Sequence, residues 1–538
     1  MNLLRRTEWA SAVLATLLVV SLHLVFFSHA GGLWRDEANT VGVSTLPTFG
    51  EFLHWLDFDS FPILWLLIMR GWHVIGLGSD GALRVLGCAV GLGLVGALWL
   101  NARAFNYRLP FFSLLLLGIN SSVIRWGDSI RAYGFGMGMA VLSFATIWLI
   151  VRQPTRRHVV WACLVAILSV QTLYYNSFLL FACCVAGAVV CVRRRWWARV
   201  CVLLGAGAVA ALSMMVYIPV FRHSKNWSAL FRHSEIGSAW YWHKFSQAVA
   251  PTGGIPIWLW ILSFIAILAL GVASLLPKRL MKMTDNQQDV ALFSSVTVCV
   301  GAAAYYMFLA RLSYVTEPWY YLAFMALFAA AADAAFSVIT EGQNRRIGRL
   351  VLVAALLAAT FVPVLRKSLA RMTNVDLLAS ELNKRVDKED FVLVALWHDG
   401  VSFNRYYTGP ARWETLPPIS DHRFHRPDLL LPYMTATNQE ATLESLHEQL
   451  SQTLKKGHRV WLAGNPNFLR PGETPLILAP APYSPIGWQL GPYHRSWSTQ
   501  TAAFLQSHAT AAEEVPVPTA QPVNEYENLP LIVVSGWH

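Results

Sequence analysis

The feature that most constrains this chain is a series of apolar runs long enough to cross a membrane. They occur at about residues 9–28, 82–102, 110–124, 132–151, 158–175, 177–192, 200–220, 255–276, 290–309, 318–340 and 350–365. A transmembrane helix needs about 20 mostly apolar residues. Charged residues make up 14% of the 538 residues, well below the roughly 25% of soluble domains. The chain is therefore predicted to be an α-helical polytopic membrane protein, which excludes a soluble enzyme and a disordered chain.

The basic residues predict how these spans are oriented. Lys and Arg are enriched in cytoplasmic loops, and six basic clusters lie between the apolar runs, at residues 5–6, 103–108, 152–157, 193–199, 278–282 and 345–349. All six fall inside if there are eleven spans and a further apolar run at 61–77 does not cross. That run is then an interfacial helix with Trp65 and Trp72 at headgroup level. The N-terminus is predicted in the cytoplasm and the C-terminus outside the cytoplasmic membrane.

The same topology divides the chain into two domains. Residues 1–366 are predicted to form the membrane domain, with outward loops at 29–81, 125–131 and 221–254. From 367 to 538 the composition becomes more polar and rich in proline. Buried strands are predicted at 391–397, 459–463 and 529–534, amphipathic helices at 377–386 and 440–456, and a loop at 513–528. The second domain is therefore predicted to be a small α/β domain outside the membrane.

Cysteine usage and net charge remove other classes of protein. The seven cysteines lie in or beside the apolar runs without a C-x-x-C pair, so neither a disulfide framework nor a cysteine zinc site is indicated. The net charge of +11 comes from basic residues between apolar runs, whereas a nucleic-acid-binding surface belongs to a folded polar domain. The expected partner is the lipid bilayer, with no nucleic acid.

An acidic pair, Asp36-Glu37, lies just beyond the first apolar run and follows Arg35. Adjacent carboxylates so close to hydrocarbon are costly unless they are solvated, paired or used. In one interpretation Arg35 simply neutralises Asp36 in a solvated loop. In the other, the pair belongs to a wet site at the outer face, at the same depth as Arg84 at the outer end of the second span.

The second outward loop, 125–131, carries two arginines and Asp128 and is followed by Tyr133. An ordinary interfacial ion pair with aromatic belt residues is one interpretation. Guanidinium groups also bind phosphate oxygens through two parallel hydrogen bonds. Arg84, Arg131 or Arg311, all placed at outer membrane depth, are therefore candidates for holding a lipid phosphate.

The order of these motifs resembles that of a known family. An Asp-Glu pair after the first span, the helix start Asp59-Ser60-Phe61-Pro62, Arg84 at the next span and Arg131-x-Tyr133 are similar to the GT-C membrane glycosyltransferases. Within them, the pattern resembles the glycosyltransferase 39 group, which includes the dolichyl-phosphate-mannose protein mannosyltransferases and the lipid A aminoarabinose transferase. The resemblance covers roughly residues 9–200.

The resemblance implies an inverting transfer, on the outer face, from a polyprenyl-phosphate-linked sugar donor to a lipid, glycan or protein acceptor. It implies that Asp36 is the general base on the acceptor hydroxyl and Glu37 a supporting acid or metal ligand. Arg84 and Arg131 would hold the donor phosphate. An inverting transfer needs one base for the acceptor proton and cations for the phosphate leaving group, which agrees with this assignment.

The chain departs from the family pattern in two places. Ser60-Phe61-Pro62 replaces a His-Pro-Pro start, and Asp128 lies three residues before Arg131 instead of two, which leaves its role open. Further candidates for the substrate site are Asp128, Tyr133, His243 and Arg311.

Cofactor and function keep alternatives at this point. A Mg²⁺ or Mn²⁺ ion on Asp36 or Glu37 is one, because hard cations favour carboxylates. His223, His233 and His243 with Glu235 are another metal candidate, although spacings of ten residues match no ligand signature. The alternatives to the enzyme are a transporter or flippase of lipid-linked sugars and a non-catalytic envelope assembly protein.

Overall fold

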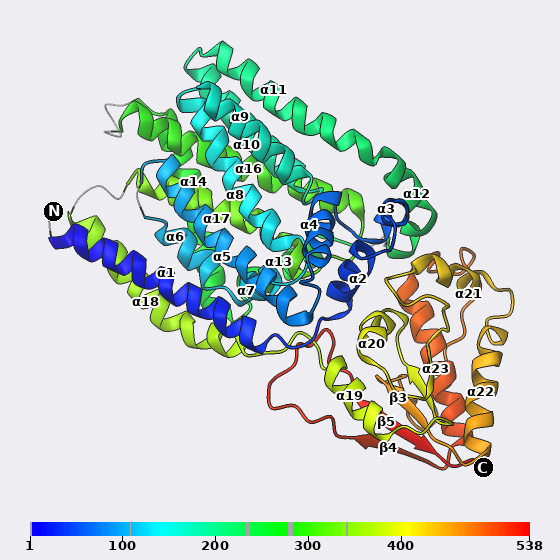
Figure 1. Cartoon of the computed structure of the whole chain (residues 1–538). Coiled ribbons are helices and arrows are strands. Elements are labelled where there is room, and N and C mark those ends of the chain that lie inside the picture. Colours follow the sequence, from blue (N-terminus) through cyan, green and yellow to red (C-terminus); the bar gives the residue numbers. More distant parts are fainter. Residues whose placement is uncertain (1–2, 108, 233–235, 278–282, 340–342) are drawn as a thin grey trace. The chain divides into compact units, whose positions relative to one another are not determined.

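The computed structural model describes residues 3–107, 109–232, 236–277, 283–339 and 343–538. The chain forms two compact units, which we call the membrane unit and the α/β unit (Figure 1). The membrane unit consists of Met1–His29, Phe61–Ile218 and Glu235–Leu369, and the α/β unit of Ala30–Ser60, Pro219–Ser234 and Ala370–His538. Two segments from the predicted outward loops thus belong to the α/β unit.

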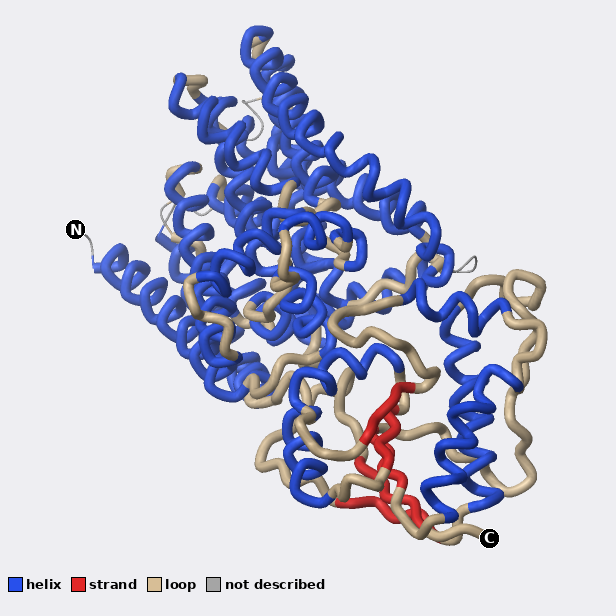
Figure 2. The backbone as a smooth tube through the Cα atoms, turned by 45° about the vertical axis from the view of Figure 1, so that its right-hand side comes forward, coloured by secondary structure: helices blue, strands red, loops and turns tan. Residues whose placement is uncertain are grey.

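The membrane unit is built from long helices (Figure 2), many of which are apolar. Over the described residues, nine helices are long and apolar enough to cross a membrane. They are α1 (Leu3–His29), α5 (Asp80–Ala104), α8 (Tyr133–Arg152), α10 (Asn176–Arg193), α11 (Trp197–Met214), α14 (Gly254–Leu275), α16 (Asp285–Leu312), α17 (Leu322–Ser337) and α18 (Gln343–Ser368). The prediction of a multi-pass α-helical membrane protein is confirmed.

Two of the eleven predicted spans take a shorter helical form. The run at 158–175 forms α9 (Arg156–Val170), which has 15 residues. The run at 110–124 is broken into α6 (Phe111–Ser113), the π-helical turn Leu114–Gly118 and α7 (Ser121–Gly127). The carboxylate of Asp333 accepts hydrogen bonds from the backbone N–H groups of Phe112 (2.8 Å) and Ser113 (2.9 Å). Asp333, buried in α17, therefore caps the start of α6, because its oxygens satisfy amides that have no partner within the helix.

The apolar run at 61–77 forms α4 (Ile63–Val74), a helix of 12 residues. At 1.5 Å per residue it is about 18 Å long, too short for a hydrocarbon core of about 30 Å. Trp65 is fully buried in the protein, where its indole N–H donates to the carbonyl of Ile130 (3.4 Å), and its placement at headgroup level stays a prediction. Trp72 is half-buried and donates to the carbonyl of Ala82 (3.2 Å).

The α/β unit contains a five-stranded sheet in the order β2-β1-β3-β5-β4. Its strands are β1 (Phe391–Val394), β2 (Arg412–Thr415), β3 (Val460–Ala463), β4 (Ala511–Val515) and β5 (Leu531–Ser535). β1 pairs in parallel with β2 and β3, while β5 runs antiparallel to β3 and β4. The predicted strands correspond to β1, β3 and β5, whereas β4 lies partly in the stretch predicted as a loop.

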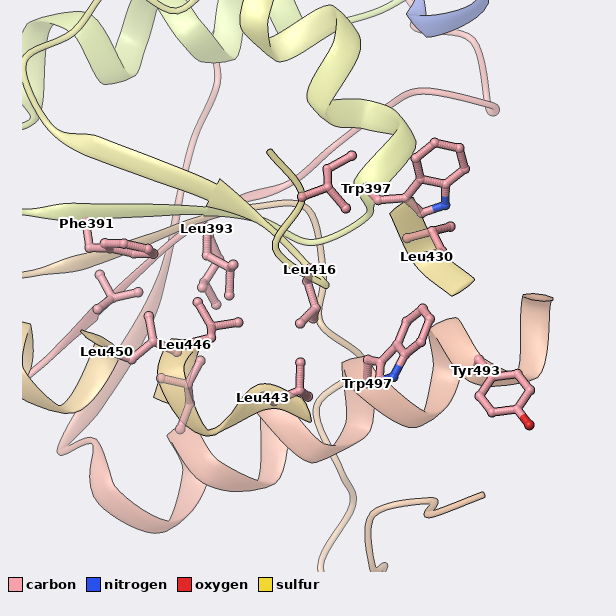
Figure 3. Close-up of a cluster of buried hydrophobic side chains, with 14 of the residues drawn as sticks. Phe391, Leu393, Trp397, Leu416, Leu430, Leu443, Leu446, Leu450, Tyr493 and Trp497 are labelled. Atoms are coloured by element: carbon pink, nitrogen blue, oxygen red, sulfur yellow. The ribbon is translucent and has the colours of Figure 1, made fainter. Parts of the chain in front are cut away.

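Both faces of this sheet are covered, which explains the continuous apolar sequence of β1 and β3. Successive side chains of a strand point to opposite faces. Phe391 and Leu393 pack in one cluster with α22 (Glu444–Lys455) and α23 (Leu490–His508) (Figure 3). Val392 and Val394 pack in the other with α19 (Val375–Arg385) and α20 (Gly400–Tyr406). Leu230 joins the first cluster, so residues 219–234 are anchored in this core.

Candidate functional site

The acidic pair predicted from the sequence lies on the first turn of α2 (Arg35–Ser44), in the α/β unit. Trp34 is the N-cap, and its backbone N–H donates to Glu37 Oε2 (3.1 Å). Glu37 is fully buried and thereby closes a capping box, in which a side chain reaches back to a terminal amide of its own helix. This contact gives Glu37 a structural role at the start of α2.

The chain enters α2 through a close backbone approach at Gly31. Gly31 has φ +67°, and a Cβ atom there would lie 2.5 Å from the guanidinium carbon of Arg371. Arg371 forms an ion pair with Asp376, and the N–H of Met372 donates to the carbonyl of Ala30 (2.8 Å). Glycine is required here because the backbone is left-handed and because the guanidinium of Arg371 occupies the place of a Cβ atom.

Asp36 keeps 23% of its side chain exposed, unlike the other acids of these motifs. A carboxylate in the first turn of a helix is favoured by the partial positive charge of the helix N-terminus. The neighbouring Arg35 has its Nε 4.0 Å from Asp36 Oδ1, at the outer limit of an ion pair. The site therefore presents a partly solvated carboxylate on a rigid turn.

Arg35 is held mainly by distant residues of the α/β unit that the sequence analysis missed. Its guanidinium donates to Asp399 Oδ1 (3.3 Å) and to the carbonyl of Tyr526 (2.7 Å). Its backbone N–H donates to Glu527 Oε2 (2.7 Å). Asp399 and Glu527 are buried, with exposed fractions of 2% and 1%. No sequence pattern marked these two acids, because their contacts with Arg35 form only on folding.

Burial sets the protonation of this cluster. It raises the pKa of both Asp399 and Glu527, and each carboxylate gains a further upward shift from a neighbouring acid, while Arg35 acts in the opposite direction. Burial and the charge of Arg35 hold the pKa of His398 well below its usual range, so this imidazole is neutral at pH 7. His398 Nε2 lies 3.4 Å from Asp399 Oδ1. The cluster therefore combines one guanidinium, a neutral imidazole and three carboxyl groups.

The acids that follow α2 are engaged in contacts within the α/β unit. Asp59 Oδ2 accepts a hydrogen bond from the hydroxyl of Thr40 (2.7 Å) in α2. Asp57 Oδ2 lies 2.8 Å from His223 Nδ1 and accepts from the indole N–H of Trp227 (3.0 Å). His223, one of the metal candidates, is thus a hydrogen-bond partner that ties residues 219–232 to the first loop.

In the membrane unit, Asp128 joins three helices. His23 Nδ1 of α1 lies 2.8 Å and 2.9 Å from its two carboxylate oxygens, and both side chains are buried. A Cβ atom on Gly91 of α5 would lie 1.9 Å from Asp128 Oδ1. Asp128, a candidate substrate-site residue, is therefore a packing partner of His23 at the C-cap of α7, a role that the sequence analysis did not predict.

The predicted phosphate-binding arginines are both buried in this unit. Arg84 and Arg131 are 5% and 4% exposed. The guanidinium of Arg131 lies over the ring of Phe61, 4.3 Å from its centre, and Phe61 packs edge-on against Tyr133. Two of the quoted motifs, the Phe-Pro start and Arg-x-Tyr, thus meet. The hydroxyl of Tyr175 is buried in electrostatic range of Arg131, so aromatic rings and a hydroxyl surround this cation.

The remaining candidates lie at exposed positions. His243 in α13 (Ser238–Val249) and Arg311 in the last turn of α16 are both exposed. His243 Nε2 lies 3.1 Å from Gln247 Nε2 of the same helix. Within the described parts of the chain, no group of three or more His, Cys, Asp or Glu residues is arranged to hold a metal ion. His233 and Glu235 lie outside the described residues.

Comparison with known proteins found no matching protein-family model and no matching curated protein. Several solved structures are similar to this one at low sequence identity. ArnT from Cupriavidus metallidurans in the apo state has 14% sequence identity and a TM-score of 0.49, covering 84% of this chain and 93% of that one. Its complex with undecaprenyl phosphate has a TM-score of 0.44 at 14% identity, covering 83% and 92%. The oligosaccharyltransferase of Archaeoglobus fulgidus, tethered to an acceptor peptide, has 11% identity and a TM-score of 0.47, covering 85% and 69%.

The lipid A aminoarabinose transferase that the sequence motifs resemble is thus among the proteins to which this structure is similar. A structure of the oligosaccharyltransferase with zinc and sulfate is similar too, with 12% identity, a TM-score of 0.48 and coverage of 84% and 68%.

Proposed function

We propose that this chain is a GT-C membrane glycosyltransferase. It transfers a sugar from a polyprenyl-phosphate-linked donor to a hydroxyl of a lipid, glycan or protein acceptor, on the outer face of the cytoplasmic membrane. The observation that carries this proposal is the state of Asp36. Among the acids of the quoted motifs, Glu37, Asp59 and Asp128 are buried and form hydrogen bonds. Asp36, on a capped helical turn, keeps about a quarter of its side chain exposed to solvent.

The chemistry needs few groups. The Asp36 carboxylate takes the proton of the acceptor hydroxyl as its oxygen attacks the anomeric carbon. The bond from that carbon to the phosphate oxygen breaks, configuration inverts, and the electron pair leaves on polyprenyl phosphate. Arg84 and Arg131 stabilise the phosphate, because charge-assisted hydrogen bonds from guanidinium groups are strong where water is excluded. No step requires a metal ion at Glu37, which caps α2.

Transfer with purified protein tests the proposal. The enzyme is incubated with radiolabelled polyprenyl-phosphate sugars, including undecaprenyl-phosphate donors, and with membrane extract as acceptor. Asp36→Asn preserves the shape of the side chain and removes the base, so turnover should fall about 10²- to 10⁴-fold while donor binding persists. Asp428→Asn, which alters another acid of the α/β unit, paired with Arg426, is the control. Near-wild-type turnover in Asp36→Asn would refute the proposed role.

A further inference from the structure

The α/β unit holds the turn that carries Asp36 from two directions. From the turn that follows β1, Asp399 accepts a hydrogen bond from the guanidinium of Arg35. From the segment before β5, the carbonyl of Tyr526 accepts another, and Glu527 accepts one from the backbone N–H of Arg35. Side chain and backbone of one residue are thus fixed by three separate contacts, directly beside Asp36.

These contacts decide where the charge of Arg35 lies. Hydrogen bonds to Asp399 and Tyr526 keep the guanidinium on the buried side, with its Nε 4.0 Å from Asp36. Removal of one acid from a buried charged cluster leaves a cation that seeks another partner. Glu527 Oε2 lies 3.7 Å from the guanidinium and Asp36 Oδ1 lies 4.0 Å from it, so release of Arg35 from Asp399 would strengthen its ion pairs with both carboxylates.

Glu527 is itself held from the other side. The hydroxyl of Thr373 donates to Glu527 Oε1 (2.8 Å), which leaves Oε2 for the first amide of α2. This amide has no partner within its helix, so the cap from Glu527 sets where α2 begins. The position of Asp36, one residue later, depends on this cap.

We infer that Asp399 and Glu527 are positioning residues for Asp36, supplied by the C-terminal domain. They hold Arg35 and the start of α2 so that the Asp36 carboxylate stays out of a close ion pair and keeps its direction toward the acceptor hydroxyl. The inference rests on the proposed function and deepens it. The C-terminal domain then contributes to catalysis by positioning the residue that acts on the acceptor hydroxyl.

Several titratable groups lie in or beside this cluster in the described part of the chain. They are Arg35 and Asp36 of α2, Asp399 and His398 of the turn after β1, Glu527, and the Arg371–Asp376 pair beside Gly31. His425 and His494 lie in electrostatic range of His398. Burial raises the pKa of Asp399 to about 6, so Asp399→Asn removes the group whose protonation would release Arg35 as the pH falls.

The test compares full-length Asp399→Asn, Glu527→Ala and Glu527→Gln in the transfer assay, with separate kcat and KM values for donor and acceptor over a pH series. We expect kcat to fall about ten- to a hundredfold in Asp399→Asn and Glu527→Ala, with the donor KM within about twofold. The acidic limb of the pH profile should move to lower pH in Asp399→Asn. Glu527→Gln should recover part of the loss, because its amide oxygen can still cap α2.

Asp390→Asn is the matched control, since Asp390 is a buried acid at the other end of β1 that binds Arg459 and Trp461. It should lower thermal stability without moving kcat or the pH limb. Wild-type kcat and pH profile in Asp399→Asn and Glu527→Ala, while Asp36→Asn is inactive, would overturn this inference alone. An equal loss in Asp390→Asn would also overturn it, since stability would then explain the effect. Full activity of Asp36→Asn, or no transfer by the wild type, would overturn the proposed function and this inference with it.

Discussion

Single residues in this chain have roles set by burial more than by residue type. Asp128 and Asp36 are both aspartates beside an arginine-rich loop or turn, yet Asp128 is sealed against His23 while Asp36 remains partly exposed. Arg131 is a buried cation among aromatic rings. Its assignment to the donor phosphate stays a prediction from the Arg-x-Tyr motif.

At this scale we expect Arg84→Ala and Arg131→Ala each to weaken the binding of polyprenyl phosphate. A charge-assisted hydrogen bond contributes roughly 1.5–3 kcal/mol, or about ten- to a hundredfold in affinity. Arg131→Lys should recover only part, because an ammonium group cannot form the planar fork. Affinity is measured in nanodiscs with undecaprenyl phosphate, and exposed Arg157 provides the control Arg157→Ala. Equal affinity in all variants would remove both arginines from the phosphate site.

At the scale of elements, the start of α2 depends on the backbone before it. Gly31 combines a positive φ of +67° with a guanidinium 2.5 Å from the position of a Cβ. Gly76, at the end of α4, has φ +87° but nothing within 4 Å of that position. A substitution at Gly76 therefore meets conformational strain alone, whereas a substitution at Gly31 meets both conformational strain and a steric clash.

We expect Gly31→Ala to loosen α2 and Gly76→Ala to leave it intact. The left-handed conformation alone costs an alanine roughly 1–2 kcal/mol, and displacement of Arg371 adds to this only at Gly31. Amide hydrogen exchange of peptides from α2 in the full-length protein should rise in Gly31→Ala, and transfer activity should fall with it. Unchanged protection of α2 in Gly31→Ala would show that Arg371 moves aside without consequence.

Helix boundaries in the membrane unit follow hydrogen-bonding partners as well as hydropathy. At the start of the interrupted run 110–124, α6 is capped by Asp333, which lies more than 200 residues later. The apolar residues of 110–124 are compatible with a single span, because their sequence does not indicate that a distant carboxylate caps a helix there. The end of α4 was likewise not evident from hydropathy, because the helix ends at Val74 while the apolar run extends to residue 77.

At the scale of the whole molecule, the membrane unit and the α/β unit alternate along the chain. Residues 30–60 and 219–234 leave the membrane unit and return to it. If both excursions join the C-terminal domain on the outer side, all basic clusters remain in the cytoplasm. This arrangement is the topology predicted from Lys and Arg.

We expect alkaline phosphatase fused after His538 to be active, because alkaline phosphatase reaches its active fold only outside the cytoplasm. The same fusion after Arg157, in a predicted cytoplasmic loop, should be inactive, and a cytoplasmic reporter should give the reverse pattern. An active cytoplasmic reporter at His538 would contradict the topology and place α4 among the spans.

Elements with a local signal could be predicted from the amino acids alone. Long apolar runs predicted the membrane helices, and continuous apolar stretches predicted β1, β3 and β5, because burial of side chains follows the period of each element. Two acids beyond the first span indicated a candidate site in an outward loop, where the structure forms the first turn of α2. The contacts of these acids depend on how the chain packs. Arg35 meets Asp399 and Glu527 across 364 and 492 residues, and Asp128 meets His23 across 105. Such partners share no spacing or pattern in the sequence, since a hydrogen bond depends on the position that each atom takes after the chain has packed.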